Sequence, residues 1–120
     1  MYHFKEVILQ NGPHKRKSLI IEFDDPDMRI IGEFLMADAP LLGGQVLQEI
    51  NQVLAREKTT ITSNGNRCSL KIANPTSIVS DLFEGMNGVE VYPSYEIDTE
   101  ELRKLLVMWF QKLKEFNKNQ

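Results

Sequence analysis

Thiol and imidazole groups are scarce in this chain of 120 residues. Cys68 is the single cysteine, so an internal disulfide is impossible and no second thiolate completes a zinc-binding pair. It lies in an alternating segment between Arg67 and Ser69, which is typical of a small core residue. The two histidines, His3 and His14, flank the first predicted turn and are too few for a metal site. We therefore expect no catalytic residue, no metal and no cofactor, and a reducing compartment.

Long apolar runs are also absent. No stretch approaches the roughly 18 to 20 apolar residues that a membrane span needs, and residues 1–6 lack the basic start and apolar run of a signal peptide. We therefore expect a cytoplasmic protein that does not contact a membrane. Hydrophobic residues make up 42% of the chain and charged residues 26%, which is typical of a folded protein rather than a disordered one. The length suits a single domain over residues 1–120.

Basic residues are rare in two parts of the chain. The net charge of -3 and the pI near 5.4 give no general attraction to nucleic acid, so no direct nucleic-acid binding is expected. Between residues 21 and 40 only Arg29 is basic, and between residues 81 and 100 no residue is. The acids of these two blocks are Glu22, Asp24, Asp25, Asp27, Glu33, Asp38, Asp81, Glu84, Glu90, Glu96, Asp98 and Glu100. A solvated face is the ordinary interpretation of such a block, and a surface for a basic partner is the functional one.

The first half of the chain predicts a hairpin followed by helical segments. Residues 2–9 and 18–23 are rich in aromatic and β-branched side chains and flank the turn formers 10–14. Residues 26–36 place their apolar side chains on one helical face after an Asp25-Pro26 start, although a strand over 29–36 stays the alternative because Gly32 weakens a helix. The apolar residues of 44–56 follow helical spacing and predict a firmer helix.

The second half predicts a sheet closed by a long helix. Residues 59–62 and 67–72 flank Asn64-Gly65, the favoured centre of a tight hairpin. A short strand is expected over 77–83, and an edge strand over 89–97 because Pro93 cannot donate to a ladder. Residues 99–116 form an apolar helical stripe that begins at an Asp98 capping box and contains Trp109, which we expect to be buried. Together these elements predict an α+β class with a mostly antiparallel sheet packed by helices.

Several stretches resemble small bacterial immunity proteins. They are Gly65 to Ile72, Asp81-Leu82-Phe83, and Tyr95 to Leu102 with the Leu-rich helix that follows; the similarity is clearest over residues 57–116, and 31–35 shares it. Proteins of this kind are the antitoxin partners in contact-dependent growth inhibition and related polymorphic-toxin systems. The resemblance implies that the chain binds and neutralises a cognate toxin domain, often a nuclease, without covalent chemistry and without being an enzyme. A protein-binding adaptor of the cytoplasm and a small enzyme are the alternative hypotheses.

The acidic blocks are the candidate contact surface for that partner. A nuclease presents a basic cleft to phosphates, and an acidic partner would associate with it through electrostatic steering. No binding residue follows from the resemblance itself, so the nominations rest on charge. They are Asp24, Asp25, Asp27, Glu33, Asp81, Glu84, Glu90 and Glu96.

Overall fold

The chain begins with a long antiparallel hairpin. In the computed structural model, which describes residues 1–118, strands β1 (Tyr2–Asn11) and β2 (His14–Phe23) pair from Tyr2 opposite Phe23 out to Asn11 opposite His14. The hairpin confirms the sequence prediction, but the first strand ends at Asn11 rather than at residue 9, and the second begins at His14 rather than at residue 18. Gly12 adopts a φ of 61°, which glycine tolerates and which allows a turn of two residues. Gln10, Asn11 and His14, which were expected in the turn, are therefore paired in the strands.

Four consecutive helical pieces follow the hairpin: η1 (Pro26–Met28), α1 (Arg29–Glu33), a π-helical turn η2 (Phe34–Asp38) and α2 (Ala39–Leu42). The helix predicted for residues 26–36 is confirmed, and the alternative strand is wrong. The predicted apolar face is buried, at Ile30, Ile31, Phe34 and Leu35. Gly43 ends this run with a φ of 57°, and α3 (Gly44–Leu54) then begins, ending slightly before the predicted residue 56.

The second sheet has four antiparallel strands in the order β3-β4-β5-β6. Strands β3 (Ile61–Asn64) and β4 (Cys68–Ile72) confirm the hairpin predicted at 59–62 and 67–72, although β3 lies later than expected. The turn is also not the tight Asn64-Gly65 one, because residues 65–67 form the connection. Strand β5 (Thr76–Asp81) confirms most of the strand expected over 77–83.

A buried carboxylate sets the shape of the β3–β4 connection. Asp38 accepts hydrogen bonds from the amides of Asn66, Arg67 and Cys68 at 2.7, 2.9 and 2.6 Å. A Cβ atom at Gly65 would lie 2.3 Å from the Asp38 carboxyl carbon, so only glycine fits there. These three amides donate to the Asp38 carboxylate and not to carbonyl groups of a tight turn, which explains why the turn differs from the prediction.

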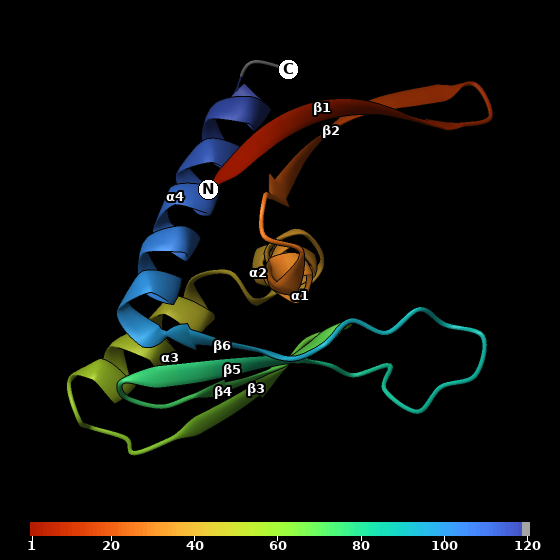
Figure 1. Cartoon of the computed structure of the whole chain (residues 1–120). Helices are drawn as coiled ribbons and strands as arrows, with labels where there is room; N and C mark the ends of the chain where they lie inside the picture. The colour runs from red at the N-terminus through yellow and green to blue at the C-terminus, as the bar shows by residue number, and fades with distance from the viewer. Residues whose placement is uncertain (119–120) are drawn as a thin grey trace.

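The edge strand predicted over 89–97 is wrong for most of its length. Strand β6 spans Tyr95–Asp98, and residues 90–94 belong to no strand. The backbone there bonds to side chains instead: the Tyr92 amide donates to Asp81, and the Glu90 carbonyl accepts from Arg67. Pro93 offers no amide. Residues 82–94 therefore form a loop that projects from the sheet (Figure 1).

The last helix, α4 (Thr99–Lys118), joins the two sheets. Its start is confirmed, since Asp98 accepts the Glu101 amide at 3.1 Å. Its N-terminal half packs on α3, β5 and β6, while the Phe4 ring of the hairpin stacks on Trp109 with centroids 6.2 Å apart. Figure 1 shows the hairpin and the four-stranded sheet extending from α4 in the same direction, with the helices η1 to α2 between them.

No single helix within residues 1–118 is long and apolar enough to cross a membrane. The helical segments Pro26–Leu42 and Gly44–Leu54, bent at 103°, reach the required length and composition only as a pair.

The Trp109 side chain meets a backbone irregularity in η2. Its ring is 1% exposed, and its Nε1 donates to the Leu35 carbonyl at 2.6 Å. In this π-helical turn Ala39 donates to Phe34, so the corresponding donor for Leu35 would be Pro40, which has no N–H. The indole therefore supplies the hydrogen bond that the helix cannot.

We expect Trp109→Ala to lower the free energy of unfolding by about 3 to 5 kcal/mol, as large-to-small core changes do. Trp109→Phe keeps most of the packing but leaves the buried carbonyl unpaired, which should cost about 1 to 3 kcal/mol. Urea unfolding followed by circular dichroism measures both. A loss below 1 kcal/mol in Trp109→Ala would contradict a role in the core.

Candidate partner-binding surface

An acidic groove lies between the base of the hairpin and helix α1. It encloses about 710 Å³ and is lined by the end of β2, the start of η1, one face of α1 and the ring of Tyr92. Its carboxylates come from Glu22, Asp24, Asp25 and Glu33, and Arg29 is the one basic residue of the described chain that lines it. Asp27 follows Asp25 in η1 and is exposed beside the groove. The structure thus brings three of the four nominated residues of the first acidic block, Asp24, Asp25 and Glu33, together in one groove, and leaves Asp27 outside its lining.

The chain fixes these carboxylates through local hydrogen bonds. Asp25 caps η1 by accepting the Asp27 amide at 2.9 Å, and Pro26 takes the first helical position. The Asp24 amide donates to the Met1 carbonyl at 3.0 Å, which ties the strand end to the N-terminus. Because the backbone is held at both points, the side chains of Asp24 and Asp27 project from a defined position.

Nearby cations neutralise the groove unevenly. Glu22 lies 3.0 Å from Lys5 and 3.2 Å from His3, and the hydrogen bond from Lys5 lowers the pKa of this exposed carboxyl. Asp24 lies 3.5 Å from the other nitrogen of His3, whose charge depends on protonation. Within residues 1–118, no basic group lies within 4.0 Å of the carboxylates of Asp25 or Asp27. These two are the carboxylates most available to an external base.

Tyr92 connects the groove to the projecting loop. The Arg29 guanidinium lies 4.9 Å from the centre of its ring, and that of Arg67 lies 5.3 Å from it. Arg29 also lies 3.6 Å from Glu33, one helical turn away. Glu22, Arg29 and Tyr92 were not among the nominated residues. The strand register, which sets Glu22 opposite His3, could have indicated the first of them, but no local signal pairs Arg29 with Tyr92.

Asp81 differs from the other nominated acids because its carboxylate lies inside the chain. The side chain is 1% exposed and accepts from the Arg67 guanidinium at 2.7 Å, the Phe83 amide at 2.9 Å and the Tyr92 amide at 3.0 Å. Burial alone would raise the pKa of Asp81, but these donors outweigh it and the pKa is lowered. Asp81 holds the base of the loop and has no free face for a partner, so we remove it from the candidate surface.

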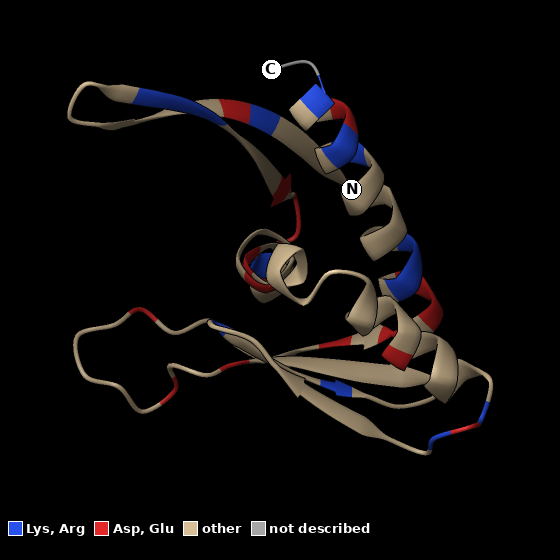
Figure 2. Cartoon of the chain, turned by 180° about the vertical axis from the view of Figure 1, so that it is seen from behind, with Lys and Arg blue, Asp and Glu red and all other residues tan. Residues whose placement is uncertain are grey.

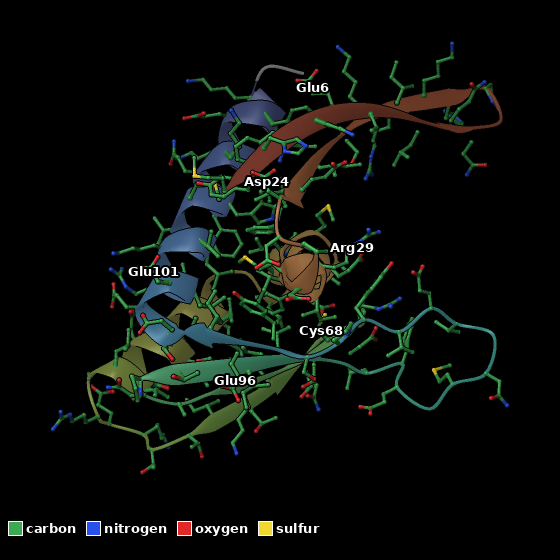
Figure 3. The ribbon with its side chains drawn as sticks, viewed as in Figure 1. Glu6, Asp24, Arg29, Cys68, Glu96 and Glu101 are labelled. Atoms are coloured by element: carbon green, nitrogen blue, oxygen red, sulfur yellow. The ribbon has the colours of Figure 1, made fainter. Side chains whose placement is uncertain are left out.

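The remaining acids of the second block are dispersed. Glu84 and Glu90 are exposed on the loop, where the Glu90 carboxylate accepts from the Tyr92 hydroxyl at 3.4 Å. Glu96 is exposed on β6, in register with Ile78 of β5, on the sheet face that is not covered by helices. Figure 3 shows Glu96 well separated from Asp24. The structure therefore does not unite this block into one patch.

Groups that could carry chemistry lie apart from the groove. Cys68 is 1% exposed on β4, and burial, with the nearby Asp38 carboxylate, raises the pKa of its thiol. The hairpin register holds His3 and His14 at opposite ends of the strands rather than near one another. Among residues 1–118, no cluster of three His, Cys, Asp or Glu side chains could hold a metal ion.

One comparison with known proteins finds a relative over nearly the whole chain. It is a protein of Bacillus cereus strain ATCC 14579 named "Immunity protein", 34% identical over 118 residues, which cover 98% of this chain and 92% of the relative. The chain belongs to the bacterial immunity proteins. No protein-family model matches it, and no solved structure does. The resemblance noted in the sequence is thus confirmed at the level of the immunity-protein family.

In this immunity protein, the Arg67–Asp81 pair should stabilise the loop at residues 82–94. We expect Asp81→Asn to lower the free energy of unfolding by about 1 to 3 kcal/mol near neutral pH, because the Arg67 guanidinium loses its carboxylate. Since the pKa of Asp81 is lowered on folding, its contribution is present above the ordinary value of 3.8 and is lost as pH falls through the lowered folded value.

Urea unfolding of the wild type and of Asp81→Asn across a pH series measures this. The difference between the two proteins should be full near pH 7 and should vanish in acid. A difference that is independent of pH, or absent at pH 7, would show that the pair does not stabilise the loop. Glu96→Gln is the matched control, because Glu96 is exposed and makes no ion pair within the described residues.

Proposed function

We propose that this immunity protein binds the toxic domain of a cognate toxin through the acidic groove and blocks it by non-covalent occlusion. The toxin would be the effector of a contact-dependent growth inhibition system or of a related polymorphic-toxin system. The single observation that carries the proposal is the gathering of Asp24, Asp25 and Glu33 around one concave surface, with Asp27 exposed in the adjoining η1. The relative named as an immunity protein supports it.

The charge of the groove favours a basic partner, and a nuclease is the class we propose. Nuclease domains bind phosphates with Lys and Arg side chains, so an acidic surface complements their clefts and speeds association. The groove is hollow where a protruding base could enter, and its apolar lining from Ile20, Ile21 and Met36 suits the stem of Lys or Arg. The proposed mechanism therefore needs no catalytic group in the immunity protein. The site of action would be the cytoplasm, where such a toxin meets its target.

The projecting loop supplies a second part of the same proposed interface. Leu82, Met86 and Val91 are exposed to 40, 53 and 37% on a loop that also carries Glu84 and Glu90. Apolar side chains rimmed by acids on one projecting segment are a composition suited to insertion into a partner surface. Arg67 and Asp81 hold the backbone at the base of the loop, which would lower the entropy that binding must overcome.

A charge-neutralised variant tests the groove. Asp24→Asn, Asp27→Asn and Glu33→Gln together remove three charges but leave the Asp25 cap of η1 intact. We expect the affinity for the toxin domain to fall at least about 10-fold, with slower association and a weaker salt dependence, because steering charges are lost. Stopped-flow binding at several salt concentrations measures the rates. Co-expression with the toxin in a sensitive bacterial host should then give growth rescue by the wild type and reduced rescue by the variant.

The matched control neutralises three exposed acids elsewhere, by Glu57→Gln, Glu96→Gln and Glu101→Gln. It carries the same change of net charge, so it should bind and rescue like the wild type. Failure of the wild type to rescue growth would contradict the immunity function for that toxin. Rescue and rates that fall only in the control variant would place the interface outside the acidic groove.

A further inference from the structure

A second groove, of opposite charge, lies between the hairpin and the C-terminal half of α4. It encloses about 750 Å³, and its basic lining consists of Lys5, Lys15, Arg16, Lys17 and Lys112. Among residues 1–118, the carboxylates that line it are those of Glu6 and Glu115. The chain as a whole has a net charge of -3, so this groove gathers positive charge on a protein that is negative overall. Figure 2 shows, as blue parts of the ribbon, the basic stretch along the hairpin and the basic positions near the end of α4.

Most of these basic side chains make no ion pair with the part of the chain that the structure describes. Lys5 pairs with Glu22, but within residues 1–118 no carboxylate lies within 4.0 Å of the charged groups of Lys15, Arg16, Lys17 or Lys112. Lys15, Arg16 and Lys17 are all exposed. Their positive charge is therefore available to an external anion and is not used to stabilise the fold.

The groove combines this charge with an apolar floor. Phe4, Leu19 and Phe116 line it between the basic residues. Further out on the hairpin, Ile8 and Leu9 are 66 and 52% exposed. Apolar surface beside unpaired bases suits a polypeptide segment with both acidic and apolar side chains, since each kind then has a partner in the groove.

Two observations disfavour nucleic acid as the occupant. Binding of single strands relies on open aromatic faces, but the Phe4 ring has Trp109 stacked at 6.2 Å and the Lys112 amine 5.0 Å from its centre. The carboxylates of Glu6 and Glu115 would also repel a phosphate backbone in the same groove. A polypeptide can place its own bases beside these two acids, and a phosphate chain cannot.

We propose that this basic groove is a second binding site for the cognate toxin polypeptide, and that it takes an acidic segment of the toxin with apolar side chains. The inference rests on the proposed function, because its partner is the same toxin. Along β2, the basic groove uses Lys15, Arg16, Lys17 and Leu19, and the acidic groove uses residues 20–23, so the two lie in series along the strand. Grooves of opposite sign in series fix the direction in which a partner docks, which gives selectivity that one charged patch cannot.

The test neutralises the hairpin end of the groove by Lys15→Gln, Arg16→Gln and Lys17→Gln. The matched control is Lys58→Gln, Lys71→Gln and Lys104→Gln, three exposed bases outside both grooves. Binding to purified toxin polypeptide at low and physiological salt should be about 10-fold weaker for the hairpin variant and unchanged for the control. Lys15→Arg with Arg16→Lys and Lys17→Arg should restore affinity, because it keeps the charge. Circular dichroism confirms that each variant is folded.

The outcomes separate this inference from the proposed function. If the wild type binds and the acidic-groove variant fails while the hairpin variant binds normally, the second site is wrong and the proposed function stands. If the wild type does not bind the toxin at all, the proposed function fails as well. Tight, hairpin-dependent binding of a single-stranded oligonucleotide at physiological salt would identify a nucleic-acid surface and overturn the inference. Dimers of the free protein that form in sedimentation velocity with the wild type but not with the hairpin variant would also overturn the inference, because a second copy of the chain would then occupy the groove.

Discussion

The hydrogen bond from the Trp109 indole to the Leu35 carbonyl holds together the parts that form both grooves. It exists because Pro40 leaves that carbonyl without a donor in the π-helical turn, and because α4 carries a large ring with one N–H at the position facing it. The same ring stacks on Phe4 of the hairpin. One side chain thus joins the hairpin, the central helices and the last helix. The acidic groove lies between the first two of these elements, and the basic groove lies between the first and the third.

Two buried carboxylates, Asp38 and Asp81, fix the conformation of the loops of the four-stranded sheet. Asp38 accepts three amides of the β3–β4 connection, and Asp81 accepts two amides of the β5–β6 loop. A carboxylate has enough acceptor sites to satisfy several backbone donors that a regular ladder would otherwise use. Acidic residues in this chain therefore serve two purposes. Some maintain loop geometry in the interior, and others give the surface its charge.

Local patterns predicted much of the fold. Alternation and turn residues located both hairpins, and the apolar stripe identified α4 and the buried Trp109, because burial and hydrogen bonding act over a few neighbouring residues in such elements. The Asp25 and Asp98 caps were predictable for the same reason. The edge strand at 89–97 was not, since its amide and carbonyl groups bond to Asp81 and Arg67, far back in the sequence. Charge counting likewise could not separate exposed Asp27 from internal Asp81, because burial depends on tertiary contacts.

The acidic groove is the main proposed contact with a toxin, and hydrogen exchange followed by mass spectrometry tests this contact most directly. Exchange of the free immunity protein is compared with exchange after saturation with the toxin domain. We expect slower exchange over residues 24–33 and at Tyr92, which contain most of the groove lining, and no change over residues 69–80, which lie outside it. Slower exchange confined to residues 69–80, with residues 24–33 unchanged, would contradict it.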